Sequence, residues 1–237
     1  MKKLLLIITL FLLGVNMLLA QTKKVYTTTS GEWIFSYPVI DNNGSDKGAR
    51  TRYSPVFNFQ WHINADAGKH WGLFTGLAIR NIGFIYDVPN TSEKKKYRTY
   101  NLGIPVGLKI GNLQKVCFLA GYELELPFNY KEKTFIDERK VDKFNVWFSE
   151  RTPAVMHSVM CGIQLPRGTT IKFKYYITNF FNKNFESLDA NGNLYKPFLN
   201  FEAHLFYVSL NFTMLKNRKF IHAPKSTGPV MEAMLIK

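Results

Sequence analysis

The sequence has few of the features that mark a helical membrane protein, a metalloprotein or an enzyme. Its mean hydropathy of −0.13 is too low for several membrane-spanning helices. Its histidines, aspartates and glutamates form no cluster at the spacing of metal ligands, and no motif of a catalytic nucleophile occurs. We therefore expect a protein without a metal, a cofactor or an enzymatic activity.

The N-terminus has the order of a signal peptide. Two lysines precede an apolar run at residues 4–13, and a Leu-Leu-Ala sequence ends at Ala20. A retained membrane anchor is disfavoured, because the run is short and Asn16 interrupts its end. We expect export, with residues 1–20 removed.

Acidic residues are scarce relative to basic ones, at 17 against 31, which gives a net charge of +14. Such a charge attracts anionic headgroups and the phosphates of lipopolysaccharide. An exported protein has little access to nucleic acid. We therefore expect outer-membrane lipid, including lipopolysaccharide, as a partner, and no nucleic acid.

The stretch at residues 97–110, YRTYNLGIPVGLKI, alternates between two kinds of side chain, which predicts a β-strand. One face is apolar over about 11 residues, the length that a tilted strand needs to cross a bilayer. The other face is small or polar, which suits the narrow interior of a small barrel. The apolar face consists of Tyr100, Leu102, Ile104, Val106, Leu108 and Ile110.

Other segments repeat this alternation, and the connections between them alternate in length. The predicted strands lie at residues 32–39, 56–64, 71–84, 97–110, 116–126, 154–165, 171–178 and 204–212. The long connections are 40–51, 85–96, 129–152 and 182–202, and the short ones are 65–69, 111–114 and 166–168.

This pattern predicts an all-β fold, an eight-stranded antiparallel up-and-down transmembrane β-barrel. The barrel must close, because an open sheet edge in lipid would leave backbone groups unpaired. A soluble lipocalin-like barrel would keep its apolar residues inside, and here the charges are on the inner face. We expect the outer membrane of a Gram-negative bacterium, with both termini periplasmic. The expected division is a signal peptide at 1–20, a periplasmic lead-in at 21–30, the barrel at 31–214 and a basic periplasmic tail at 215–237.

Three stretches, GLFTGLAIR, NLGIPVGLKIG and FLAGYELELP, resemble the outer-membrane β-barrel family of the Bacteroidetes. Its members are described as PorT-like or as eight-stranded relatives of outer membrane protein A. The resemblance covers roughly residues 31–214. It implies an outer-membrane protein, linked to secretion in the PorT-like case, and it supplies no catalytic residues.

The inward-facing positions of the predicted strands carry charges of both signs. A lumen of this width is filled by side chains, so opposite charges there should pair. We expect a plug of ion pairs, with a conducting or proton-relaying path as the alternative. The predicted lumen charge cluster is Glu32, Arg80, Lys109, Glu123, Glu125, Lys172 and Lys174.

Two pairs of residues are candidates for a hydrolase site and for a disulfide bond. His157 and Ser158 are residue types that a lipid hydrolase uses as base and nucleophile, but they are adjacent, and neighbours in a strand point to opposite faces. The same rule puts Cys117 inside and Cys161 outside, so we expect both thiols to be free although the periplasm permits disulfides.

The sequence thus favours a non-enzymatic outer-membrane barrel with a structural or interaction role. The charged connection at 129–152 is a solvated face, part of which extends the hairpin above the membrane, or, since it also contains aromatic residues, a candidate binding surface. The alternatives are an accessory barrel of a secretion system, which engages envelope proteins through its tail, and a lipid-modifying hydrolase.

Overall fold

A computed structural model describes residues 24–42, 44–189 and 191–217. The predicted signal peptide and residues 218–237 of the predicted tail lie outside these ranges. No helix in the described ranges is long and apolar enough to cross a membrane. The elements are β1 (Lys24–Asn42), β2 (Ala49–Arg50), β3 (Arg52–Ser54), β4 (Phe59–Asp66), β5 (Trp71–Asp87), β6 (Glu93–Gly111), β7 (Cys117–Ile136), β8 (Arg139–Trp147), β9 (Met156–Gln164), the 3-10 turn η1 (Pro166–Gly168), β10 (Thr169–Tyr176), β11 (Ser187–Leu188), β12 (Leu194–Tyr195) and β13 (Phe201–Asn217).

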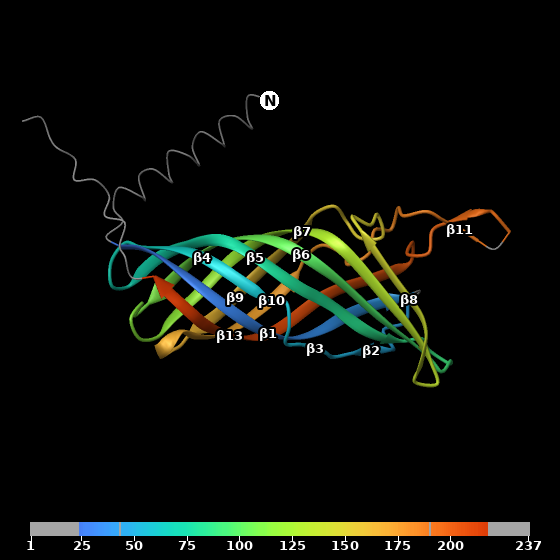
Figure 1. The fold of residues 1–237 in the computed structure, drawn as a ribbon, viewed down its shortest axis with the longest axis horizontal. Coiled ribbons are helices and arrows are strands. Elements are labelled where there is room, and N and C mark those ends of the chain that lie inside the picture. The colour runs from blue at the N-terminus through green and yellow to red at the C-terminus, as the bar shows by residue number, and fades with distance from the viewer. Residues whose placement is uncertain (1–23, 43, 190, 218–237) are drawn as a thin grey trace, which may run out of the picture.

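Eight strands form a closed wall in the order β1, β4, β5, β6, β7, β9, β10 and β13. Each strand pairs antiparallel with the next, and β13 returns to pair with β1 over almost its whole length. Figure 1 shows the resulting elongated barrel with its tilted strands. The predicted fold, an all-β antiparallel up-and-down barrel of eight strands, is confirmed.

The two ends of the barrel differ. One end, the short-turn end, holds the turns at 67–70, 112–116 and 165–168, together with the start of β1 and the end of β13. The opposite end, the hairpin end, carries β8 and the small β11–β12 hairpin (Figure 1).

Five of the eight wall strands, β1, β5, β6, β7 and β13, are longer than the sequence predicts. Residues 24–30, predicted as a lead-in, belong to β1 and pair with β4, for example through Thr27 and Ile63. Most of the predicted loop 129–152 is a paired hairpin of β7 and β8, and the loop 85–96 shrinks to residues 88–92. Sheet pairing requires only backbone groups, so polar side chains do not end a strand outside the bilayer.

The faces of the strands are as the alternation predicts. On the outside, large apolar side chains are exposed, for example Ile110 at 55% and Phe118 at 63%. Inside, Glu123 and Arg80 are fully buried. Cys117 is buried, Cys161 is exposed and both are free, in agreement with the predicted parity.

Candidate functional site

The middle of the lumen holds six of the seven predicted charged residues. They come from four strands: Glu32 from β1, Arg80 from β5, two glutamates from β7 and two lysines from β10. Each occupies an inward position of its strand, so the closure of the wall brings residues far apart in sequence together. The ion-pair layer, as we call it, consists of Glu32, Arg80, Glu123, Glu125, Lys172 and Lys174.

Arg80 is the centre of this layer. Its guanidinium contacts Glu32, lies 3.0 Å from Glu123 through Nη2 and lies 3.5 Å from Glu125 through Nε. A single planar side chain with several donors can satisfy three carboxylates at once. All four side chains have no exposure to solvent.

Two lysines complete the charge balance. Lys174 Nζ lies 2.7 Å from Glu123 Oε2 and also contacts Glu125. Lys172 Nζ lies 2.8 Å from Glu32 Oε1. The layer therefore pairs three basic side chains with three carboxylates, which leaves no uncompensated charge within it.

Neutral groups that the sequence analysis did not single out supply the remaining hydrogen bonds. Ser209 donates to Glu32 at 2.5 Å, Tyr176 donates to Glu125 at 2.8 Å, and Asn101 donates to the other oxygen of Glu125 at 2.7 Å. All three occupy inward positions, so strand parity was the signal available for finding them. Gly103 is required nearby, because a Cβ at this position would lie 2.2 Å from Glu123 Oε1.

Lys109 is not part of this layer, which corrects the prediction. Its position on β6 is opposite Leu119, whereas Glu123 is opposite Pro105, four residues closer to the hairpin end. Lys109 Nζ instead lies 2.8 Å from Asp66. Asp66 belongs to the predicted connection 65–69, and the structure places it at the end of β4 with its side chain buried.

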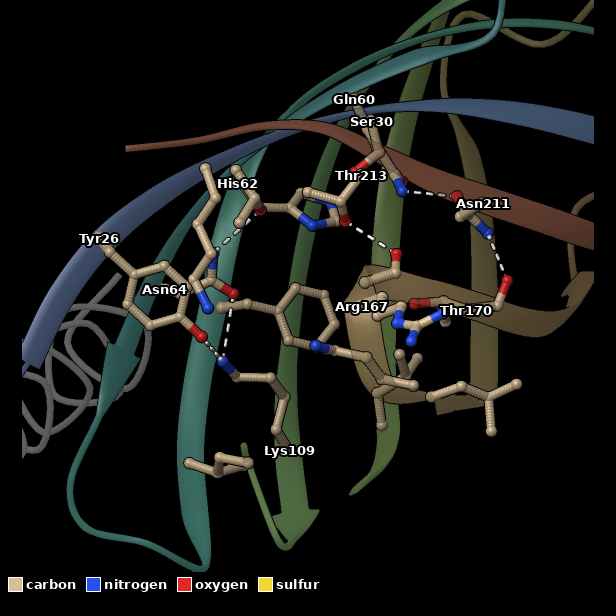
Figure 2. A pocket seen from close by; sticks show the side chains of 18 of the residues that line it. Tyr26, Ser30, Gln60, His62, Asn64, Lys109, Arg167, Thr170, Asn211 and Thr213 are labelled. Atoms are coloured by element: carbon tan, nitrogen blue, oxygen red, sulfur yellow. Dashed lines mark hydrogen bonds between the residues drawn. The ribbon is translucent and has the colours of Figure 1, made fainter. Parts of the chain in front are cut away.

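This second pair lines a cavity of about 690 Å³ between the ion-pair layer and the short-turn end. Figure 2 shows Lys109 bonded to Tyr26 and Asn64 on one wall, and Gln60 bonded to Asn211 on another. The cavity walls are mainly polar, so the lumen on this side of the ion-pair layer is suited to water.

Toward the hairpin end, the lumen is filled by aromatic rings. Phe181 stacks on Phe198 with a centroid distance of 4.2 Å, and Phe84 meets Phe180 edge to face at 5.2 Å. The rings come from β5, β6 and β13 and from the connection between β10 and β13, which folds back into the barrel. The aromatic layer, as we call it, consists of Phe84, Tyr97, Phe180, Phe181, Phe198 and Phe201, all of them buried.

The geometry gives little support to a hydrolase site at His157 and Ser158 or to a metal site. His157 is exposed on the outer face beside Tyr122, whereas Ser158 is buried and donates to the carbonyl of Glu123. The two therefore do not form a nucleophile and base pair, as parity predicts. Among the residues that the structure describes, no group of three or more His, Cys, Asp or Glu could hold a metal ion.

No family model matches the sequence, and no curated protein matches it. Solved structures with a similar fold include Ail of Yersinia pestis in complex with the heparin analogue sucrose octasulfate, at 11% identity and a TM-score of 0.36, covering 80% of this chain and 99% of Ail. Neisserial surface protein A is 7% identical with a TM-score of 0.35, and the match covers 79% of this chain and 96% of that protein. CarO2 of Acinetobacter baumannii is 11% identical with a TM-score of 0.36, and the match covers 79% of this chain and 99% of CarO2. Likeness of this degree identifies no family, and the barrel assignment rests on the strand pairing of this chain.

Proposed function

We propose that the protein crosses the outer membrane of a Gram-negative bacterium as a plugged barrel and acts there, without catalysis, in a structural or interaction role. The observation that carries this proposal is the distribution of polar and apolar side chains, which is the reverse of that in a water-soluble protein. Charged side chains are buried at the centre, and large apolar side chains face outward around the wall. In water such an exterior would be unstable, whereas in hydrocarbon it is the favoured arrangement.

The height of the apolar exterior supports this placement. On β6, Tyr100 lies in an outer aromatic row with Phe128 and Trp147, and Ile110 lies in a second row between Trp71 and Phe118. The ten residue steps from one row to the other rise about 34 Å along the strand, or about 26 Å along the normal of the bilayer at a tilt of about 40°. That is the height of the apolar band of outer-membrane barrels.

The difference between the two ends supports an orientation. Outer-membrane barrels have short periplasmic turns and longer extracellular connections. We therefore place the short-turn end in the periplasm and the hairpin end outside the cell. The lumen is blocked by two layers, so interactions would take place at the hairpin end.

Fractionation and protease accessibility test this proposal. The mature protein should sediment with the outer membrane and resist extraction by carbonate or urea. Protease added to intact cells should cut, if anywhere, near residues 137–138 or in 182–200, and should spare 112–116 and 165–168. Recovery in the soluble periplasmic fraction would overturn the location, and external access to a tag after residue 237 would overturn the orientation.

Two finer assignments stay predictions. The first is membership of the PorT-like Bacteroidetes barrels. A role in secretion would act through the tail, of which residues 218–237 lie outside the described ranges. A lipid-modifying activity has no observation in its favour among the described side chains.

A further inference from the structure

The outer face of the barrel at the hairpin end carries a dense group of basic side chains. Beyond the aromatic row of Tyr100, Phe128 and Trp147, strands β5 to β8 continue as paired hairpins. Paired residues share a face, so the register shows which side chains lie together. The basic face, as we call it, consists of Arg50, Lys94, Lys96, Arg98, Lys131, Lys133, Lys140 and Lys143.

Like charges are direct neighbours on this face. Arg98 on β6 is opposite Lys131 on β7, and Lys96 is opposite Lys133, which is itself opposite Lys143 on β8. Adjacent strands are about 4.8 Å apart, and like charges directly opposite each other are destabilising. The cost of this arrangement is removed when anions bind between the cations.

The protein itself supplies few of these anions. Among the described residues, Asp87 bonds to Arg50 and Glu138 bonds to Lys94, at the margin of the face. Partial desolvation, followed by repulsion from Arg98 and the nearby lysines, lowers the pKa of Lys133 below its usual value. The centre of the basic face thus has an excess of positive charge.

The opposite face of the same hairpins has a different composition. Its positions alternate with those of the basic face and include Tyr97, Tyr130 and Glu132, with Lys95 close to Glu93 at 3.3 Å. Lys95 and Arg139 are the two basic residues that the described hairpin strands place on this face, against eight on the basic face. A need for solubility alone does not explain this concentration of cations on the outer face, which indicates a ligand on that side.

The basic face lies at the level where lipid phosphates are expected. Arg98 is two residues beyond Tyr100 on β6, which is about 7 Å along the strand. Aromatic girdles mark the boundary between hydrocarbon and headgroups. The first basic side chains therefore lie just outside the hydrocarbon, on the lipid-facing side of the wall.

We propose that the basic face binds the phosphates of phosphorylated glycolipid headgroups in the outer leaflet, the leaflet of lipopolysaccharide. This inference rests on the proposed function, since it requires the hairpin end to be outside the cell. The chemistry is that of several ammonium and guanidinium groups converging on phosphate oxygens, with the acyl chains lying along the apolar exterior below.

The test is binding of purified, folded protein in detergent to bis-phosphorylated lipid A, compared with lipid A from which the phosphates have been removed. Wild-type protein should prefer the phosphorylated form, and the preference should weaken as salt is added. The variant Lys96→Gln/Lys133→Gln/Lys143→Gln should bind it about a hundredfold more weakly at low salt.

The matched control removes three lysines from the same end of the barrel, as Lys95→Gln/Lys183→Gln/Lys196→Gln. Each of these contacts an acidic side chain, and none lies on the basic face. The control should bind within about twofold of the wild type. If the basic-face variant loses affinity for bis-phosphorylated lipid A and the control does not, the site is localised on the basic face, because both variants lose the same net charge.

Three results would overturn the proposal: equal wild-type affinity for lipid A with and without phosphates, wild-type affinity in the basic-face variant, or competition by inorganic phosphate at the same concentration as lipid A. The first comparison needs no variant, so it decides the matter even if the triple variant fails to fold. Failure here in a protein that still fractionates with the outer membrane would remove this inference and leave the proposed function intact.

Discussion

The ion-pair layer and the aromatic layer fill the same lumen by different physical means. The ion-pair layer relies on directed contacts between balanced charges, centred on Arg80, and tolerates no missing partner. The aromatic layer relies on the area and shape of stacked rings, and half of its rings come from the connection between β10 and β13. Along β5 the change takes place within a few residues, from Arg80 to Ile82 and Phe84. The lumen is thus blocked at two levels, and we expect a barrel that loses one layer to stay closed at the other.

The largest effect is expected from Arg80→Met, which leaves three buried carboxylates with too few cations. Removing one partner of a buried ionic group costs about 3–5 kcal/mol in the free energy of unfolding. The control is Arg50→Met, because Arg50 pairs with Asp87 while its side chain is 58% exposed, and it should change stability by about 0–1 kcal/mol. Urea unfolding in lipid vesicles, followed by tryptophan fluorescence, measures both. Equal losses in the two variants would contradict the central role of Arg80.

A somewhat smaller loss, about 3 kcal/mol, is expected from Phe181→Ala in the aromatic layer. Phe181 is buried and contacts all five other rings of that layer, Phe84, Tyr97, Phe180, Phe198 and Phe201. Phe148→Ala is the control, since Phe148 is 78% exposed and should contribute little. The same unfolding assay applies. The Phe181 variant should still block ions, because the ion-pair layer is intact, and a new conductance in it would show that the aromatic layer alone closes the lumen.

The smallest of these losses is expected from Glu123→Gln, at about 1.5–3 kcal/mol, because glutamine keeps the shape and one acceptor while the charge is lost. Glu132→Gln is the matched control at the hairpin end, where Glu132 is half-buried and accepts a hydrogen bond from Tyr130. We expect the control to lose less than about 1 kcal/mol. If the two glutamates prove equally sensitive, the ion-pair layer has no special contribution to stability.

The alternation of side chains predicted the wall and the inward direction of the central charges, because parity depends only on the two-residue period of a strand. It could not predict the register between strands, which is why Lys109 was grouped with Glu123 although the pairing separates them. Asp66 was missed for a related reason: a polar residue beside a glycine-containing turn looks the same whether it ends a strand or begins a loop.

The aromatic layer could not be predicted from strand patterns at all. Phe180, Phe181 and Phe198 lie outside the strands of the structure and enter the lumen because their connection folds back over the barrel. The charged side chains of the β7–β8 hairpin fit either a loop or an extension of the hairpin, because its pairing is made by backbone groups that the side-chain pattern does not report.

The most direct test of the plugged barrel is the conductance of wild-type protein in planar lipid bilayers. Wild-type protein should show no stable open channel, and the Glu123→Gln variant should be less stable yet equally non-conducting. The plugged barrel is overturned by a steady ion-selective conductance in the wild type, with a selectivity that Glu123→Gln alters while the free energy of unfolding stays the same. That result would show that the central charges line a water-filled path.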